Sequence, residues 1–294
     1  MHIVIAGGSG SVGKALRNHF ENKGNQVFAL SRNAKNPIHR WDPEKGVINP
    51  EALQEADVVI NLAGANMAGG LWTKKYKKLL YDSRIDSTKL LVETLAKLSQ
   101  KKRHFIQASA VGYYANSPEW MTEEHPPGND FLAQLARDWE VEGCKVKSES
   151  TLLSIVRLGV VLQRGQGFLS KTVPPARFGL ATAFGKGNQW MSWVHIDDVC
   201  RSIDWIIENQ AEGAFNVVAD EPSTNKALTA AIAKAVKRPF FLPNVPGFLL
   251  KWLLGDFSAE LLADHRASNK KLQTMGFQFR FKHIESALND LLNE

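Results

Sequence analysis

A glycine-rich segment near the start of the chain has the spacing of a loop that binds a diphosphate. It follows the apolar stretch His2–Ala6 and reads Gly7, Gly8, Ser9, Gly10, Ser11, Val12, Gly13, which fits G-x-x-G-x-x-G and G-x-G-x-x-G at once. Glycine lets the chain turn tightly, lets the backbone approach a pyrophosphate, and lets the next helix pack close to the strand. The free N–H groups at the start of that helix then bind the phosphates. We predict that these seven residues bind a dinucleotide; a tight glycine turn without a ligand is the alternative.

The residues after the second apolar stretch indicate which dinucleotide is bound. Gln26–Leu30 leads into Ser31 and Arg32, where an NAD site of this kind usually has an acidic residue on the ribose hydroxyls. Arg32 suits stacking on adenine and pairing with a 2′-phosphate, with Ser31 and Lys35 as helpers. The segment therefore favours NADP(H) over NAD(H), unless Arg32 is an ordinary exposed arginine. Small residues in a later turn would let its backbone lie against the cofactor, or would serve packing alone: Asn61, Leu62, Ala63, Gly64.

Three hydroxyl-bearing residues are the candidates for catalysis. Ser109 ends the strand expected nearest the nicotinamide, where its hydroxyl can donate a hydrogen bond to a substrate oxygen. Tyr113 and Tyr114 follow, and either can donate a proton if a nearby cation lowers its pKa. Packing or stacking on a substrate is the alternative for both tyrosines. No acidic or histidine-rich group has the spacing of a metal site, so we predict no metal.

Short apolar stretches alternate with amphipathic ones and define the scaffold. The predicted strands are His2–Ala6, Gln26–Leu30, Asp57–Leu62, His104–Ser109 and Leu152–Leu158, and the predicted helices between them are Val12–Lys23, Lys74–Ser99 and Asp130–Ser148. This alternation is typical of an α/β fold with a doubly wound parallel sheet, which binds ligands at the carboxyl ends of its strands. We predict a Rossmann domain over residues 1–220 and a smaller, mainly helical C-terminal substrate lobe over residues 221–294, with a short strand at Phe277–Phe281.

The segment Trp193–Asp198 joins a predicted strand to a predicted helix. Asp197 or Asp198 is expected to cap that helix by accepting backbone N–H groups. For His195 an architectural role is favoured over a catalytic one. Arg157, Gln189, Trp190 and Trp193 are expected to border the substrate cleft.

The amino-acid composition limits the kinds of partner that we expect this protein to bind. The net charge is +6, but its lysine clusters are typical of solvated helix faces and accompany no nucleic-acid motif. Two cysteines make no disulfide framework, no signal peptide is visible, and the longest apolar runs are too short to span a membrane. We expect a cytoplasmic monomer or homodimer that binds a small, possibly sugar-like molecule rather than nucleic acid or membrane.

The same residues resemble the extended short-chain dehydrogenase/reductase superfamily, and within it the YfcH-like group of epimerase family proteins. Shared features include the glycine loop, Asn61-x-Ala63-Gly64, Ser109 with Tyr113, and Gly187-x-Gln189-x-x-Ser192-Trp193-x-His195-x-Asp197-Asp198, and they extend over essentially the whole chain. The resemblance implies an NAD-dependent epimerase/dehydratase-like domain holding NADP(H), followed by a C-terminal domain of unknown function. It also places Arg84 where many members carry Asn; this arginine faces the cleft as an anion partner or pairs with Asp82 or Glu93 at the surface.

One departure from the superfamily concerns catalysis. Its sugar-nucleotide enzymes use a Tyr-x-x-x-Lys pair, and this chain has none; the expected helix offers Phe131 and Leu135. Asp130 or His125 are candidates to replace the base. The sequence therefore supports an oxidoreductase or nucleotide-sugar-epimerase-like protein that acts on a small polar substrate. The alternative is a catalytically silent NADP(H)-binding regulator or sensor.

Overall fold

The computed structural model describes residues 1–98 and 101–293, and its central layer is a six-stranded parallel sheet. The strand order is β12 (Gly213–Val217), β8 (Thr151–Leu158), β6 (Arg103–Ala110), β5 (Val58–Asn61), β1 (His2–Ala6) and β2 (Gln26–Leu30). The chain adds β2 on one side of β1 and β5 on the other, so the winding reverses at β1. The predicted doubly wound α/β fold is confirmed, and the five strands predicted for it lie within one residue of β1, β2, β5, β6 and β8.

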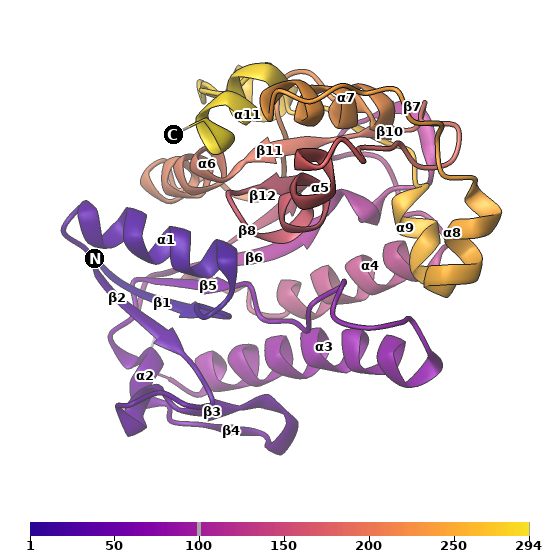
Figure 1. The fold of residues 1–294 in the computed structure, drawn as a ribbon. Coiled ribbons are helices and arrows are strands. Elements are labelled where there is room, and N and C mark those ends of the chain that lie inside the picture. The colour runs from indigo at the N-terminus through magenta and orange to yellow at the C-terminus, as the bar shows by residue number, and fades with distance from the viewer. Residues whose placement is uncertain (99–100, 294) are drawn as a thin grey trace.

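Helices cover both faces of this sheet (Figure 1). Helices α1 (Ser11–Asn22) and α6 (Ile196–Glu208) pack on one face, and α3 (Lys74–Lys97) and α4 (Phe131–Cys144) on the other, with the short α2 (Glu51–Gln54) beside them. Alternate strand residues face opposite layers, so Ile3 and Ile5 join the first core while Val4 joins the second. The predicted end of α3, Ser99, lies outside the described residues.

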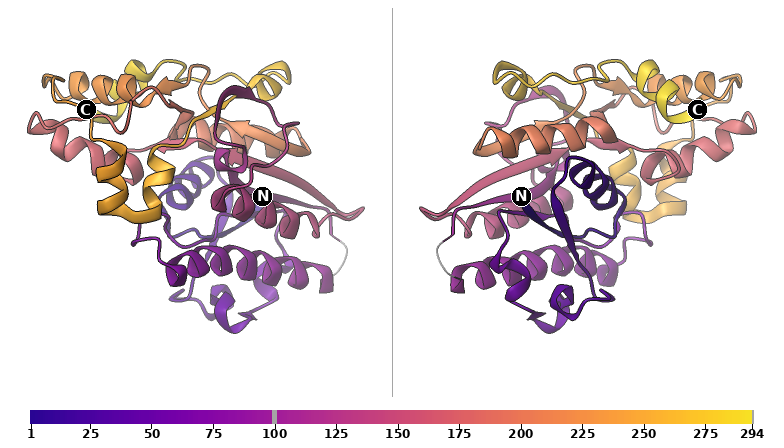
Figure 2. Two further views of the ribbon diagram at one scale, coloured as in Figure 1. Left: turned by 90° about the vertical axis from the view of Figure 1, so that its right-hand side faces the viewer. Right: turned by 90° about the vertical axis from the view of Figure 1, so that its left-hand side faces the viewer.

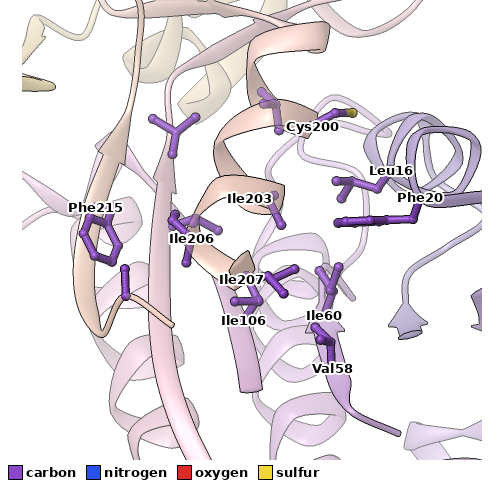
Figure 3. Close-up of a cluster of buried hydrophobic side chains, with 14 of the residues drawn as sticks. Leu16, Phe20, Val58, Ile60, Ile106, Cys200, Ile203, Ile206, Ile207 and Phe215 are labelled. Atoms are coloured by element: carbon purple, nitrogen blue, oxygen red, sulfur yellow. The ribbon is translucent and has the colours of Figure 1, made fainter. Parts of the chain in front are cut away.

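The core between α1, α6 and the sheet consists of buried apolar side chains. Leu16 and Phe20 of α1 and Ile203 of α6 are 0% exposed, and Figure 3 shows them against Ile60 and Ile106 of the strands. Burial of each such side chain stabilises the fold by about 1.5–3 kcal/mol. This packing fixes the position of the first helix, and therefore of the glycine loop that precedes it.

The antiparallel pair of β3 (Trp41–Asp42) and β4 (Val47–Ile48) lies beside α2 and packs in the core that Val4 joins (Figure 1). Most other elements form a second lobe that is assembled from segments far apart in the sequence. Its mixed sheet has the order β13 (Ser223–Thr224), β10 (Trp190–Met191), β14 (His265–Ala267) and β7 (Ser117–Met121), and a parallel pair joins β9 (Val160–Leu162) to β11 (Trp193–His195). The helices of this part are α5 (Gly167–Arg177), α7 (Asn225–Ala235), α8 (Gly247–Leu254), α9 (Ser258–Leu261), α10 (Lys270–Thr274) and α11 (Ile284–Leu292). In Figure 2 most of the yellow C-terminal part lies on the side away from α3, while the gold α8 and α9 reach back towards it.

Two expectations about the C-terminal half are wrong. Phe277–Phe281 is not a strand: the alternating phenylalanines are buried, but the segment pairs with none of the described strands. The carboxylate of Asp198 accepts hydrogen bonds from the N–H groups of Arg280 and Phe281, both at 2.8 Å. Asp198 therefore holds this segment in place, an interaction called the Asp198 brace below, and does not cap the helix. The N-cap of α6 is His195, whose Nδ1 accepts a hydrogen bond from the N–H of Asp197 at 3.1 Å.

Other expected cleft residues are internal. Trp193 is 0% exposed and its indole N–H donates to the carbonyl of Glu221 at 2.9 Å, so it belongs to the core and not to a cleft wall. Within the described residues, no helix combines the length and apolarity that a membrane span requires.

Candidate functional site

A large cleft opens where the winding of the sheet reverses. Its volume is about 1300 Å³, and its walls include the residues that follow β1, β2 and β5 together with the first half of α3. Such crevices outside the carboxyl ends of the strands are where open α/β sheets bind ligands. The cleft brings together Gly7, Ser9, Ser31, Arg32, Ala63 and Gly64 from the sequence-based candidates.

The glycine loop is shaped by close backbone contacts. Gly7 has φ +82°, and a Cβ there would lie 2.7 Å from the carbonyl oxygen of Leu62. A Cβ on Gly13 would lie 2.5 Å from the carbonyl oxygen of Gly7. Gly10 differs, because its hypothetical Cβ has one neighbour, the oxygen of Gly7 at 3.3 Å. The fold itself therefore requires glycine at positions 7 and 13, while at position 10 glycine leaves open space outside the loop.

The first turn of α1 has no side-chain partner at its N-terminus. Gly10 is the N-cap, no side-chain hydrogen bond caps the helix, and no acidic residue occupies the first turn. Ser9 and Gly10 are exposed, and Ser11 and Val12 are half-buried. The unpaired N–H groups and the positive end of the helix dipole make this turn suitable for an anion such as a diphosphate.

Arg32 stands open at the end of β2. Its side chain is 70% exposed, and its guanidinium lies 4.0 Å from the Glu44 carboxylate, a loose contact between two exposed groups. Ser31 accepts a hydrogen bond from the N–H of Asn33 at 3.2 Å, which orders the turn before the cleft. The arginine is therefore available to an anionic ligand.

One wall of the cleft, the segment 41–44, is not predicted from the sequence. Trp41, Asp42, Pro43 and Glu44 line the cleft together with Arg32. Strand β3 has only two residues, which is too short for a period-two pattern to reveal. The first turns of α3 were assigned to a solvated face, but Lys75 and Lys78 also line the cleft.

The turn after β5 is held by a buried polar network. The amide nitrogen of Asn61 donates to Thr88 Oγ1 at 2.7 Å and to Gln107 Oε1 at 3.0 Å, and its oxygen accepts from the N–H of Ala63 at 3.2 Å. Ser83 Oγ accepts from the N–H of Ala65 at 2.9 Å. These bonds hold the backbone of residues 63–65, which line the cleft.

Arg84 supports the same turn from behind. Its guanidinium donates to the carbonyls of Leu80 at 3.0 Å and Ala65 at 3.3 Å, and it forms no ion pair with any described carboxylate. Burial lowers its pKa to about 10. The expected surface pairing is wrong, because Asp82 pairs with Lys78 and Glu93 with Lys89. Arg84 thus brings an uncompensated positive charge close to the cleft.

The structure gathers the three catalytic candidates around a buried ion pair. Ser109 Oγ donates to Glu140 Oε1 at 2.6 Å, and Glu140 accepts two hydrogen bonds from Arg157, at 2.9 and 2.8 Å. Arg157 donates in turn to the hydroxyl of Tyr114 at 2.9 Å, and that hydroxyl donates to Asn216 at 2.7 Å. Arg157 is thus an internal residue and not a cleft residue. Glu140 and Asn216 were not among the predicted site residues.

The three catalytic candidates differ in how far their side chains are exposed to solvent. Tyr114 is 0% and Ser109 3% exposed, and burial raises the pKa of Tyr114 to about 12. The Tyr113 ring is half-buried, with the guanidinium of Arg157 3.6 Å from its centre. Tyr113 is therefore the one member of the three whose side chain is more than marginally accessible.

The helix α4 carries apolar groups where the superfamily has its proton-transferring pair. The ring of Phe131 lies 5.6 Å from Trp72, with Lys77 Nζ 5.2 Å above its centre, and Leu135 is buried in the same cluster. The helix begins at the N-cap Asp130, whose carboxylate accepts from the N–H of Ala133 at 2.9 Å. His125 lies apart from α4, in an exposed loop where Nδ1 accepts from the N–H of Thr122 at 3.0 Å.

No metal centre is evident in the described part of the chain. It contains no group of three or more His, Cys, Asp or Glu side chains that is arranged to hold an ion.

The cleft has three features of a dinucleotide site: free helix N–H groups, an exposed arginine and an ordered backbone turn.

Comparison with known proteins agrees with this geometry. Residues 3–218 match the model of the NAD dependent epimerase/dehydratase family, and residues 245–291 match a domain of unknown function, DUF1731. The chain is 36% identical to the epimerase family protein ML0860 of Mycobacterium leprae, over 98% of this chain and 94% of that protein. It is 35% identical to the epimerase family protein YfhF of Bacillus subtilis, over 99% and 98%.

A solved structure is similar along its full length. The human epimerase family protein SDR39U1, crystallised with NADPH, superposes with a TM-score of 0.91 at 27% identity, covering 100% of both chains. The chain belongs to the NAD dependent epimerase/dehydratase family, and its relatives at 35–36% identity are epimerase family proteins.

Proposed function

We propose that this protein is an NADP(H)-dependent oxidoreductase or epimerase-like enzyme that acts on a small polar, sugar-like molecule. The observation that carries the proposal is the open guanidinium of Arg32, in the same cleft as the uncapped start of α1. A phosphate on the adenosine ribose would supply the anion that Arg32 lacks, and the diphosphate would take the free N–H groups. The NADPH in the similar human structure supports this assignment.

Each part of the cleft then has a role. Residues 7–13 would hold the diphosphate, Ser31 and Arg32 the 2′-phosphate, and the backbone of residues 61–64 one edge of the cofactor. Arg84 would act from behind the turn, where its charge lowers the energy of a nearby anion. When bound, the nicotinamide exchanges a hydride with a carbon atom of the substrate.

The hydroxyl candidates divide by their exposure. Tyr113 would contact the substrate, because its ring is only half-buried and is held over the Arg157 guanidinium. Ser109 and Tyr114 would be positioning residues, because both are buried and bonded to the Glu140–Arg157 pair. Both residues would hold the end of β6 and the loop that carries Tyr113 in position.

The apolar start of α4 favours a second candidate function, a cofactor-binding regulator without hydride transfer. Phe131 cannot carry a proton, and Leu135 cannot hold a ribose. Cofactor oxidation separates the two functions. An enzyme oxidises NADPH in the presence of some member of a carbonyl panel or a metabolite extract. A regulator binds NADPH and never oxidises it.

Calorimetric titration tests the cofactor assignment. We expect the wild type to bind NADPH more tightly than NADH, and Arg32→Ala to weaken NADPH binding by about 10- to 100-fold while changing NADH binding little, since a charge-assisted bond contributes about 1.5–3 kcal/mol. Arg17→Ala is the matched control, because Arg17 pairs with Glu21 on α1 and lies outside the cleft. Lack of affinity for either dinucleotide would refute the proposal.

A further inference from the structure

The C-terminal domain brings a short helix to the start of α3 and α4. The 3₁₀ turn Gly255–Phe257 precedes α9, and its Asp256 pairs with Lys77 of α3 at 2.6 Å. The ring of Phe257 lies 5.4 Å from Trp72, which lies 5.6 Å from Phe131, the first residue of α4. Figure 1 shows α8 and α9 beside one end of α4, and these contacts identify it as the N-terminal end.

This end of α4 belongs to the functional edge of the sheet. A helix that connects two parallel strands runs antiparallel to them, so its first turn lies at the carboxyl ends of the strands. Here α4 connects β6 to β8, and β6 ends beside Ser109. Helix α9 therefore lies against the edge where the proposed substrate is expected.

Two side chains that are both influenced by the charge of Asp130 have buried polar atoms without a partner. Glu260 of α9 is partly exposed as a whole, but its Oε2 is shielded from solvent and has no hydrogen-bond partner. His265 of β14 is 9% exposed, and its Nδ1 also has none. A buried polar atom without a partner costs about 1–3 kcal/mol. Each of these atoms keeps a free hydrogen-bonding position, which a polar ligand atom can fill.

The charges around Glu260 favour a proton on it. Burial and the negative charge of Asp130 raise the pKa of Glu260 to about 7. Burial lowers the pKa of His265, against the opposing effect of Asp130 and Asp264, so the imidazole favours its neutral form. Lys77, the cation on the adjoining helix, is paired with Asp256. A carboxyl group in these surroundings changes between its acid and base forms near neutral pH.

We propose that Glu260 is the acid/base residue of this protein and transfers the proton of a substrate hydroxyl or carbonyl oxygen. The inference rests on the proposed function and fills the role for which α4 has no tyrosine or lysine. With an alcohol as substrate, the Glu260 carboxylate takes the hydroxyl proton, the O–H electron pair forms the C=O bond, and the hydride that leaves the carbon passes to the oxidised cofactor. In the reverse direction, the carbonyl carbon accepts a hydride from the reduced cofactor, the Glu260 carboxyl protonates the carbonyl oxygen, and water then returns a proton to Glu260.

Proton release on cofactor binding tests this role without a known substrate. Oxidised nicotinamide carries a positive charge, and reduced nicotinamide does not. A half-protonated carboxyl beside it therefore loses its proton to solvent when NADP⁺ binds but not when NADPH binds. Calorimetric titration at pH 7, in buffers of different ionisation enthalpy, measures the difference. We expect the wild type to release up to about half a proton more with NADP⁺ than with NADPH, given a pKa near 7.

Three variants identify the group that releases the proton. Glu260→Gln is expected to abolish the difference between NADP⁺ and NADPH. Asp130→Asn keeps an oxygen for the α4 cap, removes the charge, and is expected to shift the release to lower pH. Glu93→Gln, on the exposed face of α3, is the matched control and is expected to leave the release unchanged.

The outcomes are distinct. Equal proton release with both cofactors, or a difference that persists in Glu260→Gln, overturns the role of Glu260 while leaving cofactor binding intact. No binding of either cofactor refutes the proposed function itself. If Glu260→Gln does not fold, the glutamate carboxyl carbons of the ¹³C-labelled wild type are followed by NMR. One signal should then titrate near pH 7 and move with NADP⁺ but not NADPH, and its absence overturns the inference.

Discussion

Glu140 and Arg157 form a doubly hydrogen-bonded ion pair in the interior, with bonds of 2.9 and 2.8 Å between helix α4 and strand β8. Their side chains are 8% and 5% exposed. Hydrogen bonds to Glu140 hold the pKa of the Arg157 guanidinium above its usual value despite burial. The pair bonds Ser109 on one side and Tyr114 on the other, so it fixes two neighbouring segments of the site at once.

The first prediction concerns this pair. Arg157→Met leaves the Glu140 carboxylate buried without a countercharge, which is expected to lower the free energy of unfolding by about 3–5 kcal/mol. Urea denaturation monitored by tryptophan fluorescence measures the loss. Arg17→Ala removes an exposed ion pair and is expected to change stability by less than about 1 kcal/mol. Similar losses in the two variants would show that the buried pair has no special structural role.

The second prediction separates two glycines of the loop. Gly10→Ala should fold with nearly wild-type stability, because φ is −70° and its Cβ has a single neighbour. Its methyl group should still weaken NADPH and NADH binding by a similar factor, of about 10-fold or more if one phosphate bond is lost. Gly13→Ala is expected to lower stability by about 1–3 kcal/mol, because its Cβ would overlap the Gly7 carbonyl. Thermal unfolding and calorimetric titration of both variants check the distinction, and unchanged affinity in Gly10→Ala would argue against the phosphate site.

The sequence predicts the parts of the fold that depend on local pattern. The strand at residues 2–6 and the loop at residues 7–13 are adjacent in the chain, so hydrophobicity and glycine spacing locate both. Arg32 is predictable for the same reason, since it directly follows β2. These features need no knowledge of distant contacts.

Contacts between distant residues account for what the sequence does not reveal. Tyr114 bonds Asn216, 102 positions away, and this bond helps to bury a tyrosine that the sequence places in an open loop. Phe277–Phe281 has the alternation of a strand, but the Asp198 carboxylate, more than 80 positions away, binds its N–H groups. The sequence around Glu260 has no motif and an ordinary helical composition, so it does not mark this residue as a candidate for catalysis. Only the fold places it beside Asp130.

The third prediction concerns acid stability and rests on His104. Its Nε2 lies 2.6 Å from Ser154 Oγ, and Ser154 itself donates to the carbonyl of Ala211, so Nε2 must carry the proton. Nδ1 is buried without a partner, and burial lowers the pKa of His104 to about 4. Because the folded pKa is below the unfolded value of about 6.5, protons bind the unfolded chain preferentially between these values. The contribution of neutral His104 is complete above pH 6.5 and is lost as the pH falls towards 4.

Urea denaturation at several pH values measures this loss. The free energy of unfolding should fall by roughly 2–3 kcal/mol between pH 7 and pH 4.5 on account of His104 alone. His195 and His265 also have lowered pKa values and add to the same slope. In His104→Gln, the free energy of unfolding should depend less steeply on pH, by the amount that His104 contributes. An identical pH dependence in the variant would contradict the assignment.

The last prediction concerns the brace between α6 and the C-terminal segment. Asp198 is 0% exposed, accepts from the N–H groups of Arg280 and Phe281, and pairs with Arg201 at 2.7 Å. Asp198→Ala leaves both N–H groups without their acceptor, which is expected to cost about 2–5 kcal/mol and to loosen residues 276–283. Limited proteolysis should then cut this segment faster than in the wild type. Glu208→Ala removes an exposed carboxylate of α6 that pairs with Lys23 and is expected to be cut at the wild-type rate. Because Phe277 and Phe279 of this segment pack in the same core as α1, loosening it should also weaken NADPH binding. Unchanged affinity in a proteolytically sensitive Asp198→Ala variant would show that the C-terminal segment and the glycine loop are energetically independent.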